Sequence, residues 1–228
     1  MDAIDRLSPA RSLTERAYED LRADILSCRL KPGLRLKIAD VCERLGVSLG
    51  AAREALAKLT AEGLVIAETQ RGLRVAPVSS VDLADITRTR IDIEGMCLRR
   101  AIAIGDIEWE TGIVAAFHRM SRTPLLAPGA APRVSDGFSV AHGDFHAALV
   151  RACDSAWLLR IREMLYAQSE RYRRLSVPAA ERERNLDEEH RNLMQAVLAR
   201  DAPRAAGLMQ LHLQTTADLL KIYADVNS

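Results

Sequence analysis

The sequence contains few aromatic residues: three Phe, four Tyr and two Trp make up 4% of 228 residues. Glycine and proline are also sparse, at 12 and 8 residues, whereas Ala, Leu and Arg recur throughout. Since aromatic side chains are too few to build the interior, the core must be mainly aliphatic. Ala, Leu and Arg are good helix formers, so the composition predicts a mainly α-helical protein.

Paired cysteines, a secretory leader and long apolar runs are also missing. The four cysteines lie far apart without a C-x-x-C pair, which is typical of free, mostly buried thiols in a reducing compartment. The first ten residues, MDAIDRLSPA, are acidic where a signal peptide is basic. No apolar run approaches the roughly 20 residues that span a bilayer. We therefore expect a cytoplasmic protein with no membrane partner.

A strong charge of either sign is absent as well. The formal net charge is +1, and residues 1–80 carry 13 Lys/Arg against 11 Asp/Glu. This balance is too even to indicate nucleic-acid binding, so any such function must be argued from a motif.

The pattern of apolar residues and helix-breaking residues divides the chain near residue 79. Residues 1–11 read as a flexible N-terminus, 12–79 as a head with three helices and a hairpin, and 80–228 as an all-helical domain. In the head, the predicted helices are 12–28, 37–45 and 49–62, and the predicted strands are 64–67 and 73–76. In the second domain, the predicted helices are 82–104, 106–122, 136–152, 155–175, 180–199 and 203–223.

The segment from Ile38 to Leu59 has the layout of a helix-turn-helix. Val41 and Leu45 on its first helix can pack against Ala52, Leu56 and Leu59 on its second, with Gly46 at the turn and Val47 in the angle. This packing leaves four residues near the exposed start of the second helix, where a recognition helix meets the major groove: Ser48, Leu49, Gly50 and Arg53. Taken alone, the pattern also fits a purely structural helical hairpin. The hairpin that follows, with Arg71 and Gly72 at its tip, favours a winged DNA-binding head.

Residues 12–79 resemble the DNA-binding head of the GntR family of bacterial regulators. The resemblance rests on PG-x-R-L, the ERLGVS turn, REAL-x-x-L, the EGL-V step and a glycine-tipped wing. It implies that Arg53 contacts a base or a phosphate and that Arg71 reaches the minor groove from the wing. An intramolecular ion pair is the alternative for Arg53. One departure is Leu49, where the family usually has arginine; leucine cannot donate to guanine but can touch a thymine methyl.

Four of the five histidines form a pattern. His142 and His146 are four residues apart and share a helix face, as two ligands of one metal ion do. His190 and His212 belong to the last two predicted helices, which a bundle can bring to the same place. Imidazole suits Zn, Ni, Cu and Fe, and spacing does not choose among them. His118 fits no part of this pattern and is interpreted as structural or exposed.

Residues 81–228 resemble the FCD-type effector domain of the FadR branch of this family, in its shorter, VanR-like form with about six helices. The signs are Arg90–Glu94, GDFHAALVRACDSAWL around His146, EEH at His190 and MQLHL at His212. In metal-binding members, an Asp joins three histidines around a divalent ion, and His146, His190 and His212 map onto those three. His142 occupies the Asp position, which implies a four-histidine site suited to Zn or Ni rather than Mn or Mg. Asp144 points away and is only a fallback ligand.

The resemblance also implies a small-carboxylate effector bound beside the metal, with Arg90 as the arginine that forks onto it. A solvated ion pair between Arg90 and Glu94 is the alternative. Arg171, Tyr172 and Arg173 could contribute to the pocket, but a basic cluster of this kind is more often a solvated face.

The resemblance therefore implies a homodimeric regulator, with repression as the commoner mode of action, that reads an inverted-repeat operator in double-stranded DNA. A metal-free regulator with an organic effector only is one alternative. An architectural DNA binder is another. A metal-dependent hydrolase is disfavoured, since Gly143, Asp144 and Phe145 between the paired histidines supply no general-base Glu like that of H-E-x-x-H. We expect no enzymatic activity and no catalytic residues.

Overall fold

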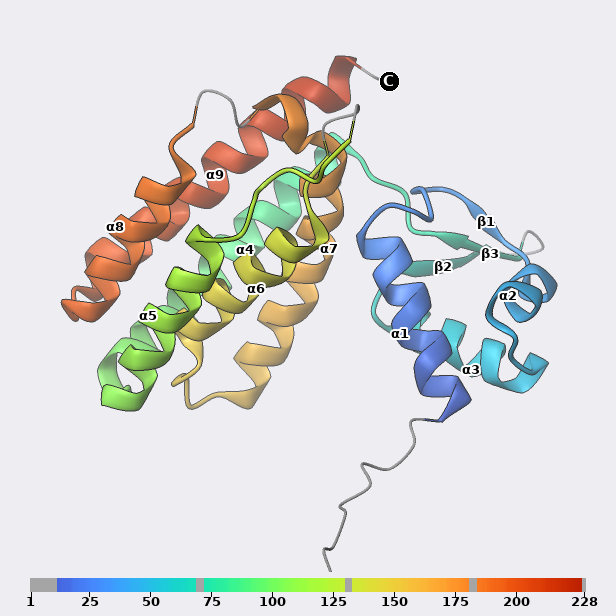
Figure 1. Cartoon of the computed structure of the whole chain (residues 1–228), viewed down its shortest axis with the longest axis horizontal. Helices are drawn as coiled ribbons and strands as arrows, with labels where there is room; N and C mark the ends of the chain where they lie inside the picture. Colours follow the sequence, from blue (N-terminus) through green and yellow to red (C-terminus); the bar gives the residue numbers. More distant parts are fainter. Residues whose placement is uncertain (1–11, 69–71, 130–132, 181–183, 227–228) are drawn as a thin grey trace, which may run out of the picture. The chain divides into compact units, whose positions relative to one another are not determined.

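The computed structural model describes residues 12–68, 72–129, 133–180 and 184–226, and the predicted flexible N-terminus, 1–11, lies outside them. Within these ranges the chain is helical apart from one small sheet, which confirms the predicted fold class (Figure 1). Two compact units are separated after Pro77, two residues before the predicted boundary.

The first unit contains three helices and a three-stranded antiparallel sheet. Its elements are α1 (Leu13–Leu26), β1 (Arg35–Leu36), α2 (Ile38–Leu45), α3 (Leu49–Ala61), β2 (Val65–Glu68) and β3 (Gly72–Val75). The strand order is β1-β3-β2, and Glu68 pairs with Gly72 at the open end of the hairpin. The hairpin was predicted, whereas β1, only two residues long, was not.

The helix-turn-helix packs as the apolar pattern predicts. Val41, Ala52, Leu56 and Leu59 are buried in one core with residues of α1 and the sheet, and Leu45 and Val47 pack against it. Gly46 ends α2 with φ of +63°, a left-handed conformation that glycine adopts without the strain a Cβ causes. The turn between α2 and α3 therefore depends on this glycine.

The second unit is a bundle of six helices in the described residues. They are α4 (Ser80–Ile104), α5 (Ile107–Ser121), α6 (Asp136–Val150), α7 (Ala156–Ala180), α8 (Leu186–Leu198) and α9 (Ala202–Val226). In this unit α4 packs against α6, α7, α8 and α9, which places it at the centre of the bundle. A mainly aliphatic core joins these helices. Leu98, Ile113 and Phe145 are fully buried in it.

Several boundaries differ from the sequence prediction. Helix α7 continues to Ala180, so the helix predicted from that residue begins only at Leu186.

All four cysteines are free, but only Cys97 and Cys153 are buried, so the expectation of mostly buried thiols holds for half of them. Across the described residues, no helix combines the length and the apolar character required to cross a bilayer.

Candidate metal centre, effector cavity and nucleic-acid interface

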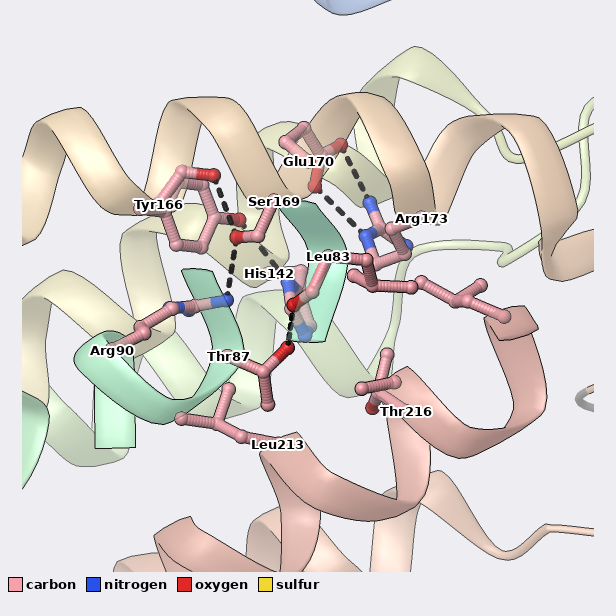
Figure 2. A pocket seen from close by; sticks show the side chains of 12 residues that line it. Leu83, Thr87, Arg90, His142, Tyr166, Ser169, Glu170, Arg173, Leu213 and Thr216 are labelled. Atoms are coloured by element: carbon pink, nitrogen blue, oxygen red, sulfur yellow. Dashed lines mark hydrogen bonds and ion pairs between the residues drawn. The ribbon is translucent and has the colours of Figure 1, made fainter. Parts of the chain in front are cut away.

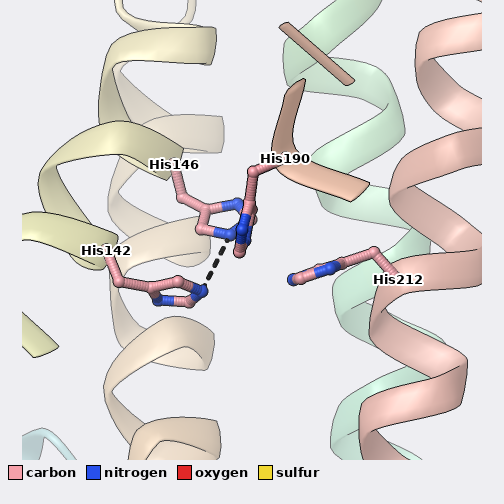
Figure 3. A group of neighbouring side chains, drawn as sticks. All are labelled: His142, His146, His190 and His212. Atoms are coloured by element: carbon pink, nitrogen blue, oxygen red, sulfur yellow. Dashed lines mark hydrogen bonds between the residues drawn. The ribbon is translucent and has the colours of Figure 1, made fainter. Parts of the chain in front are cut away.

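The four predicted histidine ligands lie together inside the bundle. His142 and His146 come from α6, His190 from α8 and His212 from α9, and all four are buried (Figure 3). One nitrogen of each lies within 4.8 Å of the corresponding nitrogen of the others. For comparison, a tetrahedral zinc site with Zn–N near 2.1 Å separates its nitrogens by about 3.4 Å.

The hydrogen bonding of these rings is compatible with a shared metal ligand role. His190 is 1% exposed, and neither of its ring nitrogens makes a hydrogen bond of normal geometry, although the backbone oxygen of Leu186 is near enough to offset part of the fall in its pKa. The Nδ1 of His146 has no hydrogen-bond partner. The Nε2 atoms of His142 and His146 lie 3.2 Å apart. Buried nitrogens without partners are costly, and a shared metal ion would satisfy one nitrogen of each ring.

Burial keeps the imidazoles neutral, which is the form that binds metals. Desolvation lowers the pKa of His142, His146 and His190 well below the ordinary value of 6.5 and lowers that of His212 as well. The positive charge of Arg173 adds to the effect at His142. Glu189 behaves differently: although burial opposes it, hydrogen bonds from His212 and Arg184 lower the pKa of this carboxyl to about 2.

The two remaining sequence candidates stay outside the cluster. Asp144 is exposed and lies on another face of α6, so the fallback ligand does not join the site. His118 is exposed on α5, as expected.

A small cavity borders the histidine cluster. Its volume is about 30 Å³, room for one or two water molecules, and His142 forms part of its wall (Figure 2). Polar groups from four helices, α4, α6, α7 and α9, meet there, and the full lining is Leu83, Thr87, Arg90, His142, Tyr166, Ser169, Glu170, Arg173, Leu213, Thr216, Ala217 and Leu220.

Arg90 reaches this cavity and is buried, at 8% exposure. Its guanidinium donates to Ser169 Oγ at 2.8 Å and lies 3.4 Å from a Glu94 carboxylate oxygen. The alternative ion pair with Glu94 is therefore present, but in the interior rather than on a solvated face. Glu94 also accepts from Arg162 at 2.8 Å, so one buried carboxylate serves two buried guanidiniums.

The expectation that Arg171, Tyr172 and Arg173 form a solvated face is wrong. All three are buried, at 1%, 5% and 7% exposure. Arg173 forms a bidentate pair with Glu170 and donates to Ser139. Arginine is normally exposed, and its burial here depends on acceptors from its own helix and from α6.

The sequence reasoning missed Tyr166, Ser169 and Glu170 of α7. The hydroxyl of Tyr166 lies 3.2 Å from His142 Nδ1, and its ring stacks on Arg90 with the guanidinium carbon 4.8 Å from the ring centre. A detectable signal was available: Arg162, Tyr166, Ser169 and Arg173 share one face of a helix, an unusual polar stripe for a face turned toward other helices.

In the first unit, the predicted DNA contacts lie at the start of α3. Ser48 caps the helix by accepting from Ala51 N–H, and Ser48, Leu49, Gly50 and Arg53 are all exposed. No ion pair of Arg53 occurs within the described residues, which favours the interpretation that its charge is available for DNA. Gly72 begins β3 with φ of +83°. Arg71 lies outside the described residues.

A winged helix-turn-helix followed by this histidine-containing bundle defines a class of bacterial transcriptional regulator. Residues 13–75 match the bacterial regulatory proteins of the gntR family, and residues 85–215 match the FCD domain. The chain belongs to the GntR family and carries an FCD domain. It is a DNA-binding transcriptional regulator rather than an enzyme, which rules out the hydrolase alternative.

Two relatives extend over nearly the whole chain. One is the uncharacterized HTH-type transcriptional regulator BphR of Paraburkholderia xenovorans (strain LB400), 40% identical over 94% of this chain and 88% of its own. Another is the HTH-type transcriptional repressor GlaR of Escherichia coli (strain K12), 36% identical over 90% and 94%. The solved structure of E. coli McbR/YncC is 21% identical, covers 92% of this chain and 98% of its own, and shares the fold with a TM-score of 0.74.

Proposed function

We propose that this chain is a homodimeric, ligand-responsive repressor whose helical domain binds a divalent transition metal, zinc in first place, and a small carboxylate effector. It would act in the cytoplasm, on an inverted-repeat operator. The observation that carries the proposal is the position of His142, which belongs to the histidine cluster and also to the wall of the cavity that Arg90 enters.

The donor set supports a borderline metal. Four neutral imidazoles with no carboxylate among them suit Zn²⁺ or Ni²⁺ better than Mn²⁺ or Mg²⁺. An ion held there supplies positive charge and coordination positions for an anionic oxygen. The residues that would hold it are His142, His146, His190 and His212.

The charge balance around the cavity supports an anionic effector. Arg90 and Arg162 share Glu94, and the Nε of Arg90 and one terminal nitrogen of Arg162 have no hydrogen-bond partner. Uncompensated buried charge is unfavourable, and a carboxylate is the group that a guanidinium binds in a bidentate manner. Because the cavity holds only one or two waters, binding of a larger acid requires Arg90 to leave Ser169.

Dimeric, repressive action rests on the family and on operator geometry. A two-fold dimer places two copies of α3 in successive major grooves, which matches an inverted repeat. The relative GlaR is named as a repressor, and an effector that favours a conformation with poor DNA affinity would relieve repression.

A second candidate is a regulator that binds an organic effector without metal. It is favoured by one observation: Arg90, Ser169 and Tyr166 line the cavity and make their contacts without the histidines of α8 and α9.

The experiment uses zinc-loaded protein and an operator obtained by in vitro selection from random duplexes. Fluorescence anisotropy of this duplex is measured against a panel of small mono- and dicarboxylates, for wild type, Arg90→Ala and the exposed neighbour Arg88→Ala. We expect a carboxylate to weaken operator binding about 5- to 150-fold, through a coupling of about 1–3 kcal/mol. Arg90→Ala should abolish this response and Arg88→Ala should retain it. An equal response in the Arg90→Ala protein would overturn the effector site. The same titration with metal-free protein separates the two candidates, because a response that needs no metal favours the regulator that binds an organic effector alone.

A further inference from the structure

His212 differs from the other three histidines in the partner of its outer nitrogen. Its Nδ1 lies 3.0 Å from Oε2 of Glu189, the first-turn residue of α8 that precedes His190. A carboxylate can only accept a hydrogen bond, so this contact requires the proton of His212 to be on Nδ1. In that tautomer Nε2 keeps its lone pair, and it is the nitrogen left for a ligand in the cluster.

Arg184 offers the opposite contact to the same nitrogen. Its Nη2 lies 3.2 Å from His212 Nδ1, and a guanidinium can only donate. A hydrogen bond from Arg184 would therefore require the other tautomer, with the proton on Nε2 and no lone pair toward the cluster. Arg184 and Glu189 thus favour opposite forms of one imidazole.

Glu189 also engages the competing arginine. Arg184 binds both carboxylate oxygens of Glu189, with Nε 2.5 Å from Oε1 and Nη2 on Oε2. The same Nη2 donates to the backbone oxygen of His212 at 3.0 Å, and Nη1 donates to Thr216. These acceptors satisfy the guanidinium, so Nδ1 of His212 is left to Glu189.

The other rings lack an equivalent control. His142 Nδ1 faces the hydroxyl of Tyr166, which can donate or accept and so permits either tautomer. His146 Nδ1 has no hydrogen-bond partner, and His190 has only the backbone oxygen of Leu186 nearby, without a hydrogen bond of normal geometry. Within the described residues, Glu189 is the carboxylate that contacts a ring of the cluster.

We infer that Glu189 is a positioning residue for the metal centre: it fixes His212 in the Nδ1–H tautomer and occupies Arg184, which would otherwise reverse it. The inference rests on the proposed metal site and adds a residue outside the ligand set. Outer partners of this kind orient metal-binding histidines and raise their basicity.

The test begins with metal-free protein, so that its first readout does not depend on metal. Nitrogen-15 NMR of the His212 ring reports which nitrogen carries the proton, with His212→Gln to assign its signals. Wild type should show Nδ1–H, and Glu189→Gln should shift the population toward Nε2–H. The matched control is Asp187→Asn, which removes another acid from the first turn of α8 and should leave the tautomer unchanged.

The second readout is zinc affinity, measured by competition with a chromogenic chelator. Glu189→Gln should weaken zinc binding about 10- to 100-fold, whereas Asp187→Asn should not. Adding Arg184→Met to Glu189→Gln should recover part of the loss, because the competing donor is gone.

Two results would overturn the inference: a wild-type His212 protonated on Nε2, or a Glu189→Gln protein that binds zinc as tightly as wild type. A wild-type protein that binds no zinc would instead reject the proposed metal site, and the NMR result would still decide what Glu189 does to His212.

Discussion

The phenolic oxygen of Tyr172 accepts a hydrogen bond from the backbone N–H of Ser79 at 3.1 Å. Ser79 is the N-cap of α4 and lies two residues after Pro77, where the first unit ends. Burial raises the pKa of Tyr172, so the phenol stays protonated and donates to Asp82 at 2.5 Å. Glu170 and Arg173, its neighbours on α7, line the cavity. One helix therefore contacts both the cavity and the start of the helical domain.

Replacement of this phenol should loosen the start of α4. We expect Tyr172→Phe to lower the free energy of unfolding of the helical domain by about 1–3 kcal/mol, because two hydrogen bonds are lost with little change in packing. Amide exchange near Ser79 and Asp82 should become faster. Asp82→Asn, which leaves the bond from Ser79 in place, should have the smaller effect in urea denaturation. Equal exchange rates in wild type and Tyr172→Phe would contradict this account.

The stability of the metal-free protein should fall in mild acid. Burial lowers the pKa of the four cluster histidines below 6.5, so between pH 7.5 and 5.5 the unfolded chain binds more protons than the folded chain. Each histidine that stays neutral in the folded protein but is protonated in the unfolded chain lowers the free energy of unfolding at pH 5.5 by up to about 1.4 kcal/mol. Urea titrations of chelator-treated protein at several pH values measure how steeply the free energy of unfolding changes with pH.

Two variants calibrate this slope. His190→Ala removes one buried histidine and should make the pH dependence shallower. His118→Ala, which removes a histidine at an exposed position, is the control. A wild-type stability that is independent of pH over this interval would show that the cluster takes up protons as readily as the unfolded chain.

Metal preference should respond to the charge of the ligand at position 142. His142→Asp replaces one neutral imidazole by a carboxylate and should raise the affinity for Mn²⁺ relative to Zn²⁺ by about tenfold or more, because hard cations prefer oxygen ligands. Competition titrations with both ions measure the ratio. Asp144→Asn is the control, since Asp144 is exposed and outside the cluster. An unchanged ratio would mean that position 142 does not ligate.

Arg53 should carry part of the affinity for operator DNA. Loss of its contact in Arg53→Ala should cost about 1–3 kcal/mol if it reads a base and reduce the salt slope by about one if it binds a phosphate. Glu54→Gln, the exposed neighbour on α3, should not weaken binding. Anisotropy titrations at several salt concentrations separate the two contacts. Full operator affinity in Arg53→Ala would contradict the assigned role of α3.

Much of the fold could be predicted because the relevant signals are local. Gly46 ends α2, Ser48 caps α3, and Val41 packs against Leu56, all within a short stretch of sequence. Strand β1 was missed because two residues carry no alternation, and they pair with β3 only once the chain folds back. The end of α7 was missed because Pro178 is a poor helix residue that the structure nevertheless places inside this helix.

The histidine ligands could be found from spacing and resemblance, whereas their surroundings could not. His142 and His146 are four residues apart, so they lie on the same face of any α-helix that contains both. Burial of Arg162 depends on Glu94, which lies 68 residues earlier in the chain, and His212 meets Glu189 across 23 residues. Such pairs follow from packing between helices, which sequence periodicity does not encode.

The central claim is that the four histidines bind a metal, and metal content tests it most directly. Protein purified without added metal or chelator is analysed by elemental mass spectrometry, beside a His190→Ala, His212→Ala double variant and the exposed control His118→Ala. The account predicts near-stoichiometric zinc or nickel in wild type and in the control, and loss of it in the double variant. Wild-type protein that stays free of metal even after incubation with zinc and nickel would contradict it.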